Sequence, residues 1–238
     1  MANPIDRRYA TRATAAAADI DVGLRQYMLK VYNYMTGGLA LTGLVAYAVA
    51  QSPAMLHAIY GTPLLWLIVL APVGMSFFFS MKIRTMQAST AQMLYWVFAA
   101  VMGLSLSFVF IAYTGASIAR VFFITAGTFA GMSLYGYTTK RDLSGMGSFL
   151  FMGLIGLILA SLVNMFLMST ALQFALSVIG VLVFTGLTAW DTQQIKEMYV
   201  EGDAEETGTK KAIMGALRLY LDFINLFLYM LQFFGNRR

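Results

Sequence analysis

The segment "GALRLYLDFINLFLYMLQFFG", residues 215–235, decides the fold because it is a membrane-length apolar stretch that carries charged side chains. A helix needs about 20 apolar residues to cross a bilayer core of roughly 30 Å. Arg218 and Asp222 lie inside this segment, and Asn225 follows one turn later. Ionisable groups at membrane depth are costly and therefore mark candidate functional sites. The segment predicts a membrane helix that contains a site.

The composition extends this interpretation to the whole chain. Of its 238 residues, 59% are hydrophobic and only 11% are charged, and the mean hydropathy is +0.70, which is too apolar for a soluble protein of this length. Continuous apolar runs, rather than short alternating segments, argue against a β-barrel. We expect an all-α integral membrane protein with seven transmembrane helices, of which the segment at 215–235 belongs to the last. They cover about 25–50, 63–80, 90–112, 117–137, 148–168, 172–199 and 212–234.

The chain divides into a short tail and one membrane domain. Residues 1–24 have no apolar core of the kind found in signal peptides, so we expect a disordered cytoplasmic N-terminal tail. Residues 25–238 form the seven-helix domain, and no length remains for a separate soluble domain. Pro72 lies inside the second span, where it should kink the helix unless a neighbouring group satisfies the freed carbonyl.

Basic residues alternate with the predicted spans and so indicate topology. The loops at about 51–62, 113–116 and 169–171 contain neither Lys nor Arg. By the positive-inside rule, the N-terminus and the basic loops are cytoplasmic, which also explains the net charge of +5 without nucleic acid. The basic residues concerned are Arg7, Arg8, Arg12, Arg25, Lys30, Lys82, Arg84, Lys140, Arg141, Lys196, Lys210 and Lys211.

The C-terminal Arg237 and Arg238 do not follow this rule, since seven spans place them outside. Either the last segment crosses despite them or it is re-entrant, and its length favours crossing. The polar connection before it, "EMYVEGDAEETGTKK" at 197–211, lacks the spacing of an EF-hand and is expected to be a solvated loop. The chain has no cysteine, which excludes disulfides and thiolate chemistry.

Asp191 and Asp222 form the candidate site. If the sixth span ends near Tyr199 and the seventh starts near Ala212, Asp191 is about 12 Å and Asp222 about 15 Å from the cytoplasmic helix ends. The two helices are antiparallel neighbours, so the carboxylates are expected at similar depth. Two ionised carboxylates about 4 Å apart repel by about 4 kcal/mol at an effective dielectric of 20. A facing pair should therefore hold one proton between them and act as a pH sensor.

Arg218 offers a different interpretation of Asp222. It precedes Asp222 by four residues on the same helix face, so an ion pair within one helix could neutralise the carboxylate without further function. Helix rotation, which the sequence does not fix, decides between the two possibilities. When deprotonated, the pair Asp191 and Asp222 would offer hard oxygen ligands suited to a transient Ca²⁺ contact.

Three stretches carry a resemblance to a known family: "GYTTKRDLSGMGSFLFMGLIGLILASLVN" (136–164), "FTGLTAWDTQQIK" (184–196) and residues 215–235. From about residue 25 onward the chain resembles the transmembrane Bax inhibitor motif family, also called Bax inhibitor-1, in its bacterial branch. The resemblance implies a seven-helix fold with a central last helix and a pH-sensitive Ca²⁺ leak gated by a di-aspartyl sensor.

The resemblance also assigns residues. The sensor aspartates match Asp191 and Asp222, and the basic partner at the inner end of the second helix falls on Lys82, with Arg84 as the neighbouring choice. Arg218 departs from the pattern, which has a small or uncharged residue there. An extra cation near Asp222 would favour the ionised form and shift gating to lower pH.

The expected function is a pH-sensitive calcium, or more generally cation, leak channel in the bacterial inner membrane. Its partners are the lipid bilayer, Ca²⁺ and protons; we expect a monomer that needs no cofactor and is not an enzyme. One alternative is a regulatory membrane protein that modulates a membrane protease or a cell-death or stress pathway. Another is an intramembrane aspartyl protease, although Tyr220 and Leu221 stand where such enzymes carry Gly-x-Gly before the aspartate. A rhomboid-type serine protease is disfavoured because the only histidine, His57, lies in an outer loop.

Overall fold

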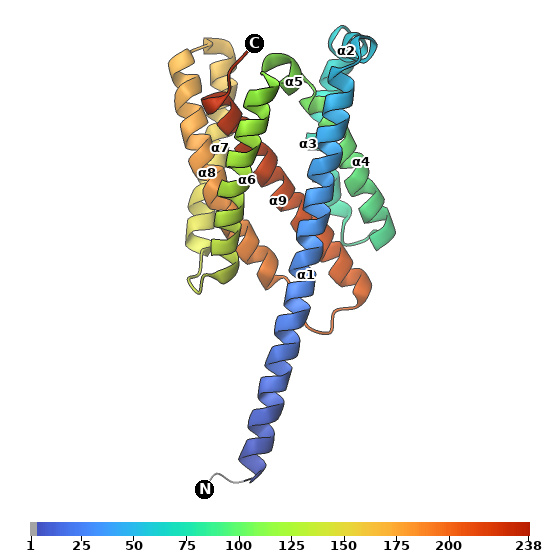
Figure 1. The fold of residues 1–238 in the computed structure, drawn as a ribbon, viewed down its shortest axis with the longest axis vertical. Helices are drawn as coiled ribbons and strands as arrows, with labels where there is room; N and C mark the ends of the chain where they lie inside the picture. Colours follow the sequence, from blue (N-terminus) through green and yellow to red (C-terminus); the bar gives the residue numbers. More distant parts are fainter. Residues whose placement is uncertain (1–3) are drawn as a thin grey trace.

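The computed structural model describes the backbone of residues 4–238 and the side chains of residues 22–238. Over this part of the chain the regular structure is helical, apart from an isolated bridge between Tyr113 and Arg237. The helices, shown in Figure 1, are α1 (Pro4–Ala50), α2 (Pro53–Tyr60), α3 (Leu64–Lys82), α4 (Ala88–Leu106), α5 (Phe108–Ala112), α6 (Gly115–Thr138), α7 (Ser144–Leu167), α8 (Thr170–Glu197) and α9 (Glu205–Phe234). The predicted disordered tail, residues 1–24, lies almost wholly outside the described side chains and stays a prediction.

The helices account for the predicted membrane spans. Six spans among the described residues are long and apolar enough to cross a membrane, with α4 and α5 together forming one of them. The described part of α1, Val22–Ala50, and α2 meet at a bend of 98° and can count as a seventh. The all-α membrane fold expected from the sequence is therefore confirmed.

Helix α9 is the centre of the bundle. It packs against α1, α4, α6 and α8, and Figure 1 shows it running obliquely between these neighbours. In its most apolar window 67% of the residues are buried inside the protein, against 11–39% in the other five single spans. The central last helix that the family resemblance implies is present.

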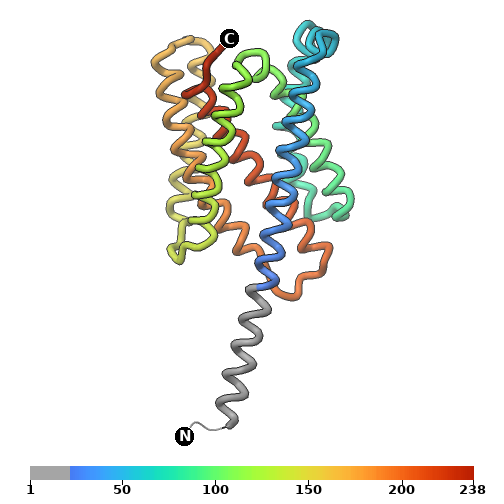
Figure 2. The backbone as a smooth tube through the Cα atoms, viewed as in Figure 1, coloured from blue at the N-terminus to red at the C-terminus, as the bar shows by residue number. Residues whose placement is uncertain are grey.

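Two ends of the bundle can be distinguished. We call one the basic end, because it carries the α3–α4, α6–α7 and α8–α9 links with their lysines and arginines. At the opposite end, the C-terminal residues are fastened to the α5–α6 link: the Thr114 amide donates to Asn236 O (3.2 Å) and the Arg238 amide donates to Ala112 O (3.0 Å). Figure 2 shows the C-terminus at the same end as the bend between α1 and α2. Helix α9 thus runs the length of the bundle and is not re-entrant.

Local hydrogen bonds explain where several helices begin and why one continues. Thr114 and Ser169 cap α6 and α8 by accepting from backbone amides at N3. Pro72 removes the donor to Ile68 O inside α3, and the Ser105 hydroxyl of α4 donates to that carbonyl instead (2.5 Å). The freed carbonyl is satisfied by a neighbouring helix, which is the condition under which a membrane helix tolerates proline.

The connection before α9 differs from the expected solvated loop. Helix α9 begins at Glu205, about two turns earlier than predicted, so residues 205–211 are helical. Glu205 and Glu206 lie in the first turn, where carboxylates stabilise the positive end of the helix dipole. Lys211 then forms an ion pair with Asp203 (2.5 Å), which closes the remaining turn. The polar composition of this stretch reflects exposure beyond the membrane span rather than the absence of a helix.

Candidate functional site

The structure brings Asp191 of α8 and Asp222 of α9 together. Both residues are buried, at 9% and 5% exposure, and their carboxyl groups lie within hydrogen-bonding reach of each other. Similar depth was the reason to expect this pair, and the rotation of the two helices does not follow from the sequence. The rotation in the structure is the one that makes them face.

Asp222 has an unsatisfied oxygen. Its Oδ2 atom is buried and has no hydrogen-bond partner among the described residues. A carboxylate has only acceptors, and two carboxylates cannot bond to each other unless one carries a proton. Because an unpaired buried acceptor is costly, a proton held between Asp191 and Asp222 would supply the donor that this pair lacks.

Arg218 contacts the other aspartate. Its Nη1 atom lies 3.7 Å from Asp191 Oδ1, and no ion pair to Asp222 occurs among the described residues. The intrahelical pair considered from the spacing of four residues is therefore wrong, and Arg218 instead bridges α9 to α8. The Arg218 side chain is 39% exposed, so it reaches Asp191 from the more exposed side of the pair.

Small residues allow the helices that carry the site to approach. At Gly136 of α6, a Cβ atom would lie 2.1 Å from Ala189 O of α8, two residues before Asp191. At Gly215 of α9, a Cβ atom would lie 2.9 Å from the Ile195 side chain of α8. Gly127 and Gly131, which lie four residues apart on α6, have open space instead. The close contacts therefore lie where α6 and α9 each pack on α8.

The depth estimate from the sequence requires correction. Asp191 is six residues from the end of α8, about 9 Å, whereas Asp222 is 17 residues from the start of α9, about 25 Å. The carboxyls still meet because α9 starts with two turns beyond the span and crosses the bundle obliquely (Figure 1). Helix ends joined by a short link were a poor reference for depth.

A polar anchor holds α9 on a different face of the helix from Asp222. The Tyr220 hydroxyl shares a 2.6 Å hydrogen bond with Thr42 of α1, and the Thr42 hydroxyl donates to Ala99 O of α4 (2.8 Å). All three helices are thus joined two residues from Asp222. This buried chain fixes the rotation of α9 and with it the direction of the carboxyl.

A polar cavity of about 280 Å³ opens among α7, α8 and α9 on the side of the pair away from the basic end. Asn225, one turn after Asp222, belongs to its wall. Asn164 also lines the cavity, and its Oδ1 accepts from the Ser169 amide in the α7–α8 link (3.0 Å). The cavity-lining Ser161, Gln173 and Gln232 were missed, although polar side chains inside apolar spans were the available signal. The complete lining is Ser161, Asn164, Gln173, Leu176, Asn225, Leu228, Tyr229 and Gln232.

Two other candidate residues do not join the pair. Lys82 and Arg84 are exposed at the basic end of α3, and neither forms an ion pair with an aspartate among the described residues. The nearby cation in the structure is Arg218. Within the described part of the chain, no group of three or more His, Cys, Asp or Glu side chains could hold a metal ion; the metal-contact assignment to Asp191 and Asp222 stays a prediction.

Together, the helical bundle, the central α9 and the buried carboxyl pair define an all-α membrane protein with an ionisable core. The family model "Inhibitor of apoptosis-promoting Bax1" matches residues 24–238, so the chain belongs to this Bax inhibitor family and the resemblance read from the sequence is confirmed.

Bacterial relatives match over nearly the whole chain. "Uncharacterized protein RP147" of Rickettsia prowazekii is 52% identical over 234 residues, covering 98% of this chain and 99% of the relative. "Inner membrane protein YbhL" of Escherichia coli is 50% identical over 219 residues, covering 91% and 94%. A protein of Caulobacter vibrioides is 45% identical over 248 residues, covering 99% of each.

Proposed function

We propose that the chain is a pH-sensitive cation leak channel, with Ca²⁺ as the permeating ion, in which Asp191 and Asp222 form the sensor. The observation that carries the proposal is the buried contact between the two carboxyls at the crossing of α8 and α9. With one proton, the pair shares a hydrogen bond that holds these helices together. Without it, two like charges repel in a site of low polarity, which favours separation of the helices.

The polar cavity supports a route for the ion. Its amide and hydroxyl groups, from Asn225, Gln173 and Ser161 among others, can replace part of the hydration shell of a cation. The cavity approaches the pair from one end of the bundle, and Arg218 reaches the pair with an exposed side chain. Separation of α8 and α9 would join the cavity to the aspartates, whose oxygens suit Ca²⁺.

The orientation and location follow from charge and relatives. By the positive-inside rule, the basic end faces the cytoplasm and the C-terminal arginines face outward. One relative is named as an inner membrane protein, and we place this chain in the bacterial inner membrane with its N-terminus inside. It acts as a monomer in this proposal, since one chain contains the whole site.

Flux measurements in proteoliposomes test the proposal. Ca²⁺ entry into vesicles loaded with a fluorescent indicator should rise as the external pH rises through the titration of the pair. Asp191→Asn and Asp222→Asn should each flatten this pH dependence. Two variants with the wild-type profile would refute the sensor assignment, whereas absence of Ca²⁺ flux in the wild type would refute the channel.

An aspartyl protease is the second candidate that the geometry allows, because two aspartates on adjacent membrane helices sharing a proton are the catalytic arrangement of that class. Incubation with a model transmembrane substrate separates the two functions. Cleavage that Asp222→Asn abolishes would support the protease, and an intact substrate alongside Ca²⁺ flux would support the channel.

A further inference from the structure

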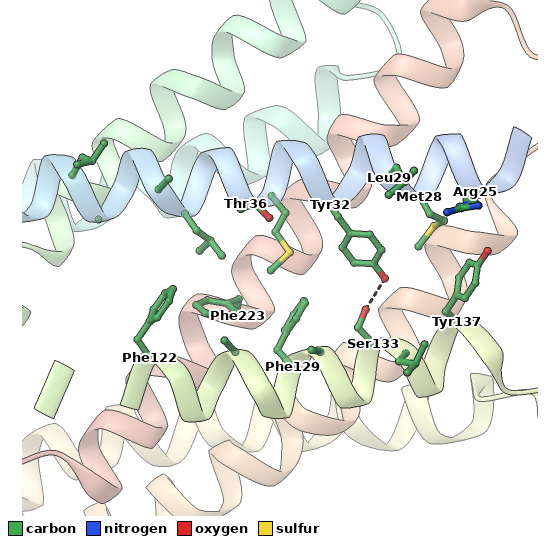
Figure 3. A pocket seen from close by; sticks show the side chains of 18 of the residues that line it. Arg25, Met28, Leu29, Tyr32, Thr36, Phe122, Phe129, Ser133, Tyr137 and Phe223 are labelled. Carbon is green, nitrogen blue, oxygen red and sulfur yellow. Dashed lines mark hydrogen bonds between the residues drawn. The ribbon is translucent and has the colours of Figure 1, made fainter. Parts of the chain in front are cut away.

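A long apolar groove separates α1 from α6. It encloses about 1080 Å³, and its floor is formed by Phe223 of α9, on which both helices pack. Figure 3 shows Phe122 and Phe129 of α6 facing α1 across this space, with Tyr32 as the polar contact between the two walls. The groove is separate from the polar cavity and from the Asp191 carboxyl.

Along its α1 wall, the groove is as long as a bilayer core is thick. On α1 its lining extends from Arg25 to Tyr47, about 33 Å at 1.5 Å per residue, which matches a bilayer core of roughly 30 Å. Small side chains, including Ala40, Ala126 and Ala130, leave room between the helices. In a bilayer, an apolar space of this length beside the lipid is available to acyl chains.

One end of the groove is suited to a phosphate. Arg25 is the one charged residue among the described residues that line it, and its side chain is exposed. Figure 3 places Arg25 and Tyr137 at the same end, which is the basic end. Lys196 donates to Tyr137 O (2.9 Å) and lies 5.5 Å from the centre of the Tyr137 ring. Arg25 therefore lies at the mouth, where a lipid headgroup would lie, and Lys196 is a second cation next to the lining residue Tyr137.

We infer that this groove binds an anionic phospholipid of the leaflet at the basic end, with an acyl chain between α1 and α6 and the phosphate at Arg25. A partner helix is the less suitable occupant, because the Tyr32 hydroxyl and Ser133 are hydrogen-bonded across the space between α1 and α6.

The bound lipid would contact residues that are connected to the aspartate pair. The Tyr32 hydroxyl shares a 2.7 Å hydrogen bond with Ser133 of α6, and Ser133 shares one of 3.0 Å with Thr192 of α8. Thr192 follows Asp191, and the groove floor Phe223 follows Asp222. Lipid binding stands without the proposed function, whereas any effect of the lipid on Ca²⁺ flux rests on it.

Lipid titration of the full chain, followed by native mass spectrometry, tests the site. The probes are phosphatidylglycerol and the zwitterionic phosphatidylcholine with the same acyl chains. Arg25→Gln should weaken phosphatidylglycerol binding about fivefold, as expected for one cation near an anionic headgroup, and should weaken phosphatidylcholine binding less, because the choline offsets the charge of its phosphate. Arg141→Gln, an exposed arginine of the α6–α7 link outside the groove, is the matched control and should bind both lipids as the wild type does.

Ala130→Phe places a ring in the groove and should reduce binding of both lipids. Its thermal unfolding midpoint, compared with that of the wild type, verifies that it folds; if it does not fold, Arg25→Gln against Arg141→Gln decides alone. Equal losses in these two arginine variants would overturn the inference in favour of general surface attraction. Wild-type binding by folded Ala130→Phe, or a dimer in place of a lipid adduct, would also overturn it.

Discussion

Helix α7 is more apolar than helix α9 but is much less buried inside the protein. The most apolar window of α7 has a mean hydropathy of 2.3 and only 11% of it is buried, whereas the corresponding window of α9 has a mean of 1.4 and 67% of it is buried. Lipid tails are as apolar as leucine, so hydrophobicity does not draw a membrane helix into the protein centre. Polar side chains do require protein partners, and in this bundle α9, which carries both Arg218 and Asp222, is the central helix.

The aspartate pair gives the largest expected effect in α9. Asp222→Asn removes the titrating group while keeping the shape of the side chain, so the ratio of Ca²⁺ flux between the high-pH and low-pH plateaus should fall toward one. Flux assays in proteoliposomes over a pH series measure this ratio. Wild-type pH dependence in this variant would show that the Asp222 carboxyl does not control gating.

Asp142→Asn is the matched control for that variant. Asp142 lies in the α6–α7 link, outside the spans, where hydrogen bonds from the Ser144 hydroxyl and amide hold the pKa of its carboxyl below the ordinary value. It therefore stays ionised across the neutral range, and its replacement should leave the pH profile of Ca²⁺ flux unchanged.

Leucine truncation compares the two helices directly. Leu219 of α9 is fully buried, whereas Leu159 of α7 is 59% exposed toward the membrane. Leu219→Ala leaves a cavity and should destabilise the fold by about 2 kcal/mol or more, while Leu159→Ala should cost below about 0.5 kcal/mol because lipid fills the space. Unfolding in mixed micelles measures both, and equal costs would break the contrast between the helices.

A similar contrast is expected between two glycines of α6. A Cβ atom at Gly136 would clash with Ala189 O, so Gly136→Ala should destabilise the protein by about 1–3 kcal/mol. Gly127→Ala has open space around it and should be neutral or slightly stabilising. Thermal unfolding midpoints in detergent compare the pair; a tolerant Gly136 would mean that α6 and α8 are less closely packed than in the structure.

Arg218 should have the smallest effect. It lies 3.7 Å from Asp191 and favours the ionised form of that carboxyl. Arg218→Gln should therefore move the midpoint of the flux profile to higher pH, and the shift should be small because the side chain is partly exposed. A shift to lower pH in the same flux assay would show that Arg218 acts other than as a counter-charge.

The sequence predicted the spans from their continuous apolar runs and the two aspartates because charge within such a run is a strong local signal, whereas the central position of the last helix was implied by the family resemblance. It did not predict the partner of Arg218, since rotation of α9 depends on distant contacts such as Thr42 with Tyr220. Nor does the sequence identify the close-packed glycine of α6, because Gly127, Gly131 and Gly136 look alike until the neighbour of each helix face is known. The apolar groove gave no sequence signal, since its lining has the composition of any lipid-facing surface.

The most direct test of the account is an infrared titration of the protonated carboxyl band in the purified protein. The account predicts a band from one shared proton that disappears as pH rises and is altered in both Asp191→Asn and Asp222→Asn. If one of these variants changes the titration while the other leaves it as in the wild type, the two carboxyls titrate independently, and the central claim of a single coupled unit is contradicted.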